Sequence, residues 1–313
     1  MAKKTTVGGM ALIEGLMMMG PEASATAIRK PDGEIVTEKK PLPKFSTNKF
    51  YKLFIIRGIV NFFRQMIIGM KAMMYSAEFV DIEDDESDEE QKQSWFDAKL
   101  EKMFKNNKEK MMTFLIYFSV IISLCFSVGL FMLLPNFIAG FLPEGISRVW
   151  KNLLEGGIRI GLFIGYLSLT SVMKDIQRVW QYHGAEHKTI FCYEAGEFLT
   201  IANVRKYSRL HPRCGTSFLF IVMIVSILVF SLLPWLGPVW NILMRLALVP
   251  FVAGLSYELL RFVGRSDNAV CKVVRKPGMW LQKLTTREPD DAQIAVAIEA
   301  IKLVIPEDNS DEW

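Results

Sequence analysis

The residues best suited to metal chemistry in this chain are its histidines. There are only three in 313 residues, His183, His187 and His211, and all fall between residues 174 and 215. His183, Glu186 and His187 form the order H-x-x-E-H. On a helix these positions share one face, so two imidazoles and a carboxylate would point the same way. This is the order of the inverted zincin motif, in which the histidines bind zinc and the glutamate polarises a water.

A metal site needs further ligands beyond this pair. His211 and Cys214 lie together just before an apolar stretch, so we expect one of them to complete the coordination. Three protein ligands would leave an open catalytic position, whereas four would close a structural site. The sequence therefore predicts a divalent-metal site, with zinc as first choice, and Glu186 as general base toward a metal-bound water. Other acidic candidates near the site are Glu194, Glu197, Glu258 and Glu14, the last beside glycines that would let it close over the site.

Long apolar segments must position these residues. The chain is 51% apolar, and its mean hydropathy of +0.23 is high for a soluble domain. A helix of about 20 apolar residues crosses the hydrocarbon core of a bilayer. We expect four membrane spans: 112–134, 156–173, 216–233 and 239–260. In the second, Arg159 would sit near the start and snorkel to the interface.

Lysine and arginine gather on alternate connections, which predicts the orientation. They are frequent before residue 112, in the loop 174–215 and after residue 260, and sparse in 135–155. We therefore expect the chain to cross the inner or plasma membrane with both termini and the 174–215 loop in the cytoplasm. The four cysteines are then free thiols rather than disulfides, and we expect Cys192 to serve packing.

The remaining segments complete an all-α multi-pass membrane bundle with a small β element. Residues 1–45 predict a cytoplasmic β element, including a hairpin turned at Pro31-Asp32-Gly33. Residues 46–80 predict an amphipathic helix; an interfacial position is favoured over a spanning one. Residues 81–111 form an acidic and then basic linker. The tail 261–313 predicts a C-terminal helix, with Ile294, Ile298 and Ile301 at helical spacing.

Several motifs together resemble the YqhQ family of bacterial membrane proteins. They cover nearly the whole chain: the run Gly8–Gly15 with the methionines after it, Arg57-Gly58, Tyr182–Lys188, His211–Gly215, and Pro277-Gly278 with Thr285–Pro289. The family is described as predicted metal-dependent enzymes of unknown function. The resemblance thus implies a metal-dependent enzyme, and it points to the same histidine block.

Two functions of different classes fit these features. The first is a metal-dependent enzyme, with hydrolysis at the cytoplasmic membrane surface as the natural reaction class. The second is a non-enzymatic membrane factor that assists assembly or holds a partner, with structural histidines. A transporter is less attractive, because the clear spans lack ionisable residues near the bilayer centre. The expected partners are the lipid bilayer and a membrane protein or a second copy; the net charge of +4 gives no reason to expect nucleic acid.

Overall fold

The computed structural model describes residues 4–42, 53–79, 108–141, 143, 145–234, 238–266, 268–308 and 310–312. Most of the predicted linker 81–111 lies outside these ranges, as do the first residues of the predicted helix 46–80 and residues 235–237 between the last two predicted spans. The chain divides into two compact units, which are described separately below. One combines Met1–Asp81 with Phe163–Trp313, and the other is Ile82–Leu162.

The predicted N-terminal β element is present as a four-stranded antiparallel sheet. Its strands pair in chain order. The turn between the last two strands has the predicted chemistry, because the Asp32 carboxylate accepts the Glu34 N–H at 2.9 Å and Gly33 adopts a φ of +88°. The strands are β1 (Gly8–Leu12), β2 (Gly15–Met19), β3 (Ala23–Arg29) and β4 (Ile35–Pro41).

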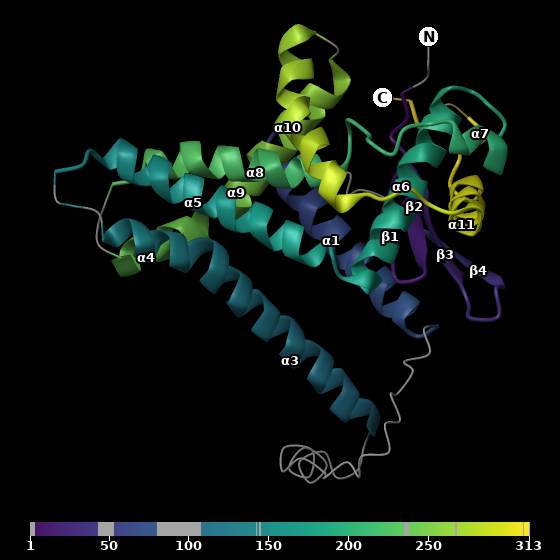
Figure 1. Ribbon diagram of the computed structural model, residues 1–313, viewed down its shortest axis with the longest axis horizontal. Helices are drawn as coiled ribbons and strands as arrows, with labels where there is room; N and C mark the ends of the chain where they lie inside the picture. Colours follow the sequence, from purple (N-terminus) through teal and green to yellow (C-terminus); the bar gives the residue numbers. More distant parts are fainter. Residues whose placement is uncertain are drawn as a thin grey trace. The chain divides into compact units, whose positions relative to one another are not determined.

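The sheet is covered on both faces by helices (Figure 1). Side chains of a strand alternate between faces. On β2, Leu16 and Met18 join a buried cluster with side chains of α6 (Lys174–Glu194) and α11 (Asp291–Lys302). Met17 points the other way, into a cluster with Ala72 of helix α1 (Ile56–Ala77). The sheet therefore fixes α6, the helix that carries the H-x-x-E-H residues.

Helix α11 lies in the segment where isoleucine spacing predicts a C-terminal helix. Ile294, Ile298 and Ile301 are all buried, against α6 and the sheet. The helix begins with a capping box, in which the Asp290 and Gln293 side chains each bond to the other's main chain. Helices α7 (Ile201–Arg205) and α10 (Ala269–Thr285) complete this part of the fold.

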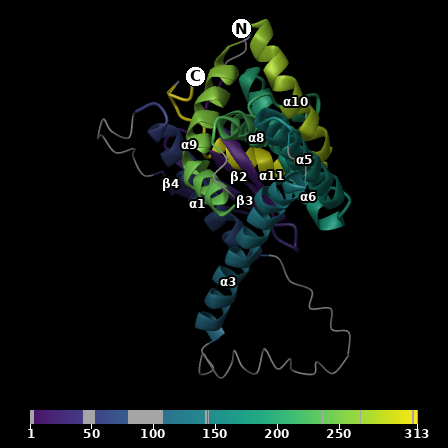
Figure 2. The same ribbon diagram turned by 90° about the vertical axis from the view of Figure 1, so that its left-hand side faces the viewer.

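Three further helices pack side by side in the same unit. Helix α9 (Pro238–Arg265) packs against both α8 (Gly215–Ser231) and α1, as Figure 2 shows. Gly58 of α1 and Gly254 of α9 meet closely, since a Cβ on Gly58 would lie 2.6 Å from the Gly254 carbonyl oxygen. Arg57 then pairs with the buried Glu258 of α9 at 2.6 Å. The predicted amphipathic helix is thus α1, packed along α9.

The second unit contains an almost continuous apolar helix followed by most of α5 (Arg148–Thr170). The sequence predicted that Arg159 would sit near the start of this helix and snorkel to the interface. The structure instead places it well inside the helix. Helix α5 begins eleven residues earlier, and Arg159 is buried, donating to Glu155 and to the Phe131 carbonyl, each at 2.9 Å. That carbonyl belongs to a π-helical segment, where a regular helical bond is displaced. The preceding segments are α3 (Lys108–Val128), η2 (Gly129–Leu133) and α4 (Leu134–Gly140).

Within the described residues, three helices rather than four are long and apolar enough to cross a membrane. They are Tyr117–Gly140, Val149–Thr170 and Val239–Arg265. The segment predicted as a span over 216–233 is α8, an apolar helix of 17 residues. At 1.5 Å per residue it is about 26 Å long, slightly short of the ~30 Å hydrocarbon core.

Candidate metal centre

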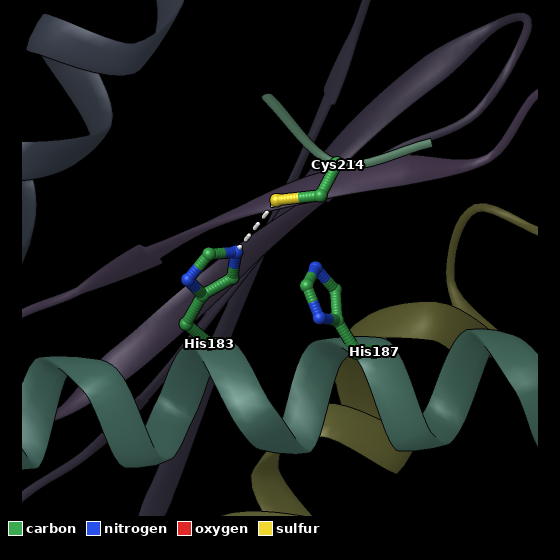
Figure 3. Close-up of side chains that lie close together, drawn as sticks. All are labelled: His183, His187 and Cys214. Carbon is green, nitrogen blue, oxygen red and sulfur yellow. Dashed lines mark hydrogen bonds between the residues drawn. The ribbon is translucent and has the colours of Figure 1, made fainter. Parts of the chain in front are cut away.

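Helix α6 presents the H-x-x-E-H residues as the helical spacing predicts. Figure 3 shows His183 and His187 rising from the same side of the helix toward Cys214. His187 and Glu186 are buried, with 1% and 5% of their surfaces exposed, while His183 is half-buried. The two imidazole centroids are 4.4 Å apart. One turn of helix thus places two imidazoles together in the interior.

Cys214 arrives from a different part of the chain, at the N-cap of helix α8. Its Sγ accepts the N–H of Thr216 at 3.3 Å, and its side chain is buried. The N-terminus of a helix carries partial positive charge, which favours a thiolate. Its Sγ also lies 3.1 Å from Nε2 of His183.

Each histidine is anchored through its other ring nitrogen to a main-chain carbonyl. His183 Nδ1 lies 2.8 Å from the Thr285 oxygen, and His187 Nδ1 lies 2.6 Å from the Arg209 oxygen. Because a carbonyl can only accept, each Nδ1 must carry a proton and donate. In the neutral imidazole this leaves the Nε2 lone pair for another partner. Metal-binding histidines are commonly oriented in this way.

The free nitrogens converge with the sulfur. The candidate ligand atoms of His183, His187 and Cys214 all lie within 4.8 Å of one another. Among the described residues, the buried Nε2 of His187 has no hydrogen-bond partner. An unpaired buried polar atom is costly, so its position calls for a ligand. The three residues fit a divalent ion that accepts nitrogen and sulfur, as zinc does.

The electrostatics of the metal-free site favour a charged pair. Burial by itself raises the pKa of the Cys214 thiol, but the charges of His183 and His187 lower it well below its ordinary value. Burial lowers the pKa of His183, yet the adjacent Cys214 thiolate raises it to about 9. A thiolate next to two imidazoles is the donor set that binds a soft or borderline divalent ion.

Glu186 lies beside the cluster and faces strand β1. The Gly9 main-chain N–H donates to its carboxylate, and a Cβ on Gly9 would lie 3.0 Å from the Glu186 Cδ. Among the described residues, Oε2 of Glu186 has no hydrogen-bond partner. Burial raises the pKa of this carboxyl, opposed by the charges of the two site histidines. Glu186 is therefore placed to accept a proton rather than to pair with a cation.

His211 is the one predicted ligand that the structure does not bring to the cluster. The Gln282 side-chain amide binds both its main-chain N–H and its carbonyl, each at 2.8 Å. Held this way, the imidazole faces Glu194, with Nε2 3.6 Å from its Oε2. Burial lowers the pKa of His211 to about 4. Cys214, three residues further on, takes the position instead.

The remaining acidic candidates are engaged elsewhere. Glu194 pairs with Arg213. Burial raises the pKa of Glu194, but its interactions with His211, Arg213 and the Thr5 main chain bring the pKa below its ordinary value. Glu197 is exposed. The other two form ion pairs outside the site, Glu258 with Arg57 and Glu14 with Arg178. The predicted closure of Glu14 over the site is replaced by this pairing, and Gly9 takes the place beside Glu186.

Several residues that shape the site were not predicted from the sequence. The carbonyls of Thr285 and Arg209 fix the imidazoles, and Gln282 fixes the His211 segment. Main-chain carbonyls carry no residue-type signal, so no motif could indicate them. Gln282 is a neutral side chain buried between helices, and only the packing of α10 on α8 reveals its partner.

Comparisons with known proteins support a bacterial family without an assigned activity. The family described as "Protein of unknown function (DUF1385)" matches residues 53–307. The chain is similar to the "Uncharacterized protein YqhQ" of Bacillus subtilis (strain 168), with 36% identity over 299 residues, covering 94% of this chain and 90% of that protein. No solved structure matches the chain.

Proposed function

This chain belongs to the DUF1385 family, and on that premise we propose that it is a metal-dependent membrane enzyme of hydrolase type. Its centre would be a divalent ion, zinc in the first instance, held by His183, His187 and Cys214. The supporting observation is that each histidine donates a hydrogen bond from Nδ1 to a main-chain carbonyl. Both Nε2 atoms are therefore left to bind one ion beside the Cys214 sulfur.

The number of ligands favours catalysis over a closed structural site. Within the described residues, the group of convergent ligand atoms has three members. Structural zinc sites usually have four protein ligands, whereas catalytic sites have three and keep one position open. The non-enzymatic factor with structural histidines therefore has less support than the enzyme.

Glu186 would be the general base of the reaction. A bound divalent ion would supply Lewis acidity toward a carbonyl or phosphoryl oxygen and would lower the pKa of water. Glu186 would take up a proton at its unpaired Oε2 and return it to the leaving group. The Gly9 N–H would hold the carboxylate in orientation, and burial would strengthen both interactions.

We also propose the membrane arrangement in which this centre faces the cytoplasm of a bacterial cell. Three helices are apolar and long enough to cross, and α8 would be a fourth, short span. Cys214 and the H-x-x-E-H helix would then lie at the cytoplasmic end of α8. The excess of lysine and arginine over 174–215 supports this orientation, with both termini on the same side.

A second candidate reaction, nucleophilic attack by a thiolate, is favoured by one specific contact. His183 Nε2 lies 3.1 Å from Cys214 Sγ while its Nδ1 is oriented by the Thr285 carbonyl. This is the arrangement of a nucleophile, a base and an orienting group. It gives no role to the unpaired Nε2 of the buried His187, and for that reason the metal enzyme is preferred.

Hydrolysis of p-nitrophenyl acetate and of bis(p-nitrophenyl) phosphate by the reconstituted full chain tests the proposal. Stripping with a chelator should abolish turnover and zinc should restore it. Glu186→Gln should lose roughly 10²–10⁴-fold in rate while retaining metal. The control Glu197→Gln, at an exposed position, should behave as wild type. Turnover that resists chelation and is lost on alkylation of Cys214 would instead support the thiolate nucleophile.

A further inference from the structure

Helix α10 has three distinct faces. One face is buried against α8: Gly278 approaches so closely that an added Cβ would lie 2.4 Å from the Ser217 Oγ. Leu281 and Thr285 share this face and are buried with it. The other two faces are presented outward, and their side chains are of two separate kinds.

The first outward face is apolar. Val273, Pro277, Trp280 and Leu284 follow one another at spacings of four, three and four residues, which places them in one stripe. Val273 is 60% exposed and Trp280 is 52% exposed, and the nearby Val270 reaches 71%. An exposed stripe of valine and tryptophan is unfavourable in water.

The second outward face is basic. Lys272, Lys276 and Lys283 are spaced by four and seven residues, and all three are exposed. A hollow of about 480 Å³ lies where the basic and apolar faces meet. It is lined by Leu210, Lys276, Pro277, Met279, Trp280 and Lys283. Lys276 and Lys283 are among its lining residues, and the lining surface is almost entirely apolar, which suits the acyl part of an anionic amphiphile.

The connection of α10 ties it to the end of a membrane-crossing helix. Helix α9, one of the three apolar helices long enough to span, ends at Arg265, and α10 begins at Ala269. Helix α10 packs on α8 near the first residues of α8, where Gly278 meets Ser217. In Figure 1 α10 crosses the direction of α8 steeply. A helix in this position stays near the membrane surface if α9 crosses the bilayer.

We propose that α10 lies in the headgroup layer of an anionic bilayer. The Val273–Trp280 stripe would enter the boundary of the acyl chains, the lysine row would meet lipid phosphates, and the upper part of one acyl chain would occupy the hollow. A helix with an aromatic and aliphatic face beside a lysine face binds membranes in this way. Anionic lipid is chosen as the partner because it complements both faces at once and because α10 follows directly on a helix long enough to cross a membrane.

This arrangement would also connect the bilayer surface to the candidate metal centre. The Thr285 carbonyl at the end of α10 orients His183, and Gln282 of the same helix holds the His211 segment. The lipid contact stands independently of metal binding, because none of the lysine or stripe side chains belongs to the cluster.

The test places a fluorescent label on full-length protein in vesicles. In a Cys125→Ser/Cys214→Ser background the two remaining native cysteines, Cys192 and Cys271, are buried, so Val273→Cys can be labelled with NBD. The vesicles are phosphatidylcholine with about one third phosphatidylglycerol, plus a lipid with a doxyl quencher near its headgroup. The label at 273 should be quenched at least about threefold more than a control label from Glu299→Cys on α11.

Charge reversal then tests the choice of lipid. Lys276→Glu with Lys283→Glu should reduce quenching at position 273 in the phosphatidylglycerol vesicles and leave it unchanged in phosphatidylcholine alone. Equal quenching at 273 and 299 would overturn the proposal. So would protection of the 273 label from both the lipid quencher and aqueous iodide, because a protein partner or a second copy would then cover the stripe. Insensitivity to charge reversal would overturn the anionic-lipid assignment.

Discussion

The Nε2 atom of His183 lies 3.1 Å from the Sγ of Cys214, although His183 belongs to α6, Cys214 caps α8, and only His183 is part of the H-x-x-E-H pattern. With His187 they form a group whose ligand atoms lie within 4.8 Å of one another. Each imidazole in the group is oriented by a hydrogen bond from its Nδ1 to a main-chain carbonyl. The following predictions depend on this group.

Cobalt should report the sulfur ligand directly. When Co²⁺ is added to metal-free protein, we expect a thiolate-to-cobalt charge-transfer band in the near ultraviolet, because the Cys214 thiolate would bind the ion. Cys214→Ser should lose this band. Cys192→Ala should keep it, since Cys192 is fully buried in an apolar cluster with Val204 and Ile294. A band that survives Cys214→Ser would exclude Cys214 as a ligand.

Stability should fall between neutral and mildly acidic pH because of His211. Burial lowers the pKa of this imidazole from 6.5 to about 4 in the folded protein, so the unfolded chain binds more protons in that interval. The neutral, buried imidazole makes its full contribution to the free energy of unfolding above pH 6.5, and this contribution is lost as the pH falls toward 4. Its full size is about 3 kcal/mol.

The measurement compares thermal unfolding at pH 7.5 and pH 5 in chelator-treated, detergent-solubilised protein. His211→Asn should show a clearly smaller drop in Tm between the two pH values than wild type, whatever its absolute stability. An equal drop in both proteins would show that His211 does not titrate as a buried neutral imidazole.

Gly184→Ala should destabilise the protein although alanine favours helices. The added Cβ would lie 2.1 Å from the Arg287 carbonyl oxygen. This segment cannot easily move away, because the Arg287 N–H donates to the Trp180 carbonyl at 2.8 Å. The steric clash should outweigh the ~1 kcal/mol that the better helix propensity of alanine contributes. We therefore expect the free energy of unfolding to fall by about 1–3 kcal/mol.

The readout for this variant is Tm together with zinc affinity, since Thr285, which orients His183, lies two residues before Arg287. Gly161→Ala is the matched control, because a Cβ there would meet nothing within 4 Å. If Gly184→Ala were as stable as wild type, the close contact of α6 with the Arg287 segment would be contradicted.

The sequence predicted the local parts of the site well. The helical face of His183, Glu186 and His187 follows from spacing alone, and the structure has that helix. The hairpin around Asp32-Gly33 likewise follows from turn chemistry. In both cases the interacting residues are neighbours in the chain, so a periodic pattern contains the relevant geometry.

Long-range contacts could not be obtained in that way. The choice between Cys214 and His211 depends on Gln282, more than sixty residues away, which clamps the His211 main chain. Arg159 was expected at an interface because its partner, a carbonyl freed by a π-helical segment, has no signature in the sequence. Among the described residues, three of the predicted spans have the length and composition of a membrane-crossing helix, whereas the helix over 216–233 is apolar but only 17 residues long.

The metal content of detergent-purified full-length protein tests the central claim most directly. Wild type incubated with zinc and then dialysed should hold about one ion per chain. A His183→Ala/His187→Ala double variant of comparable Tm should hold none, whereas His211→Asn should retain the ion, because His211 faces Glu194 outside the cluster. Folded wild type without metal, or a double variant that still holds it, would contradict the account.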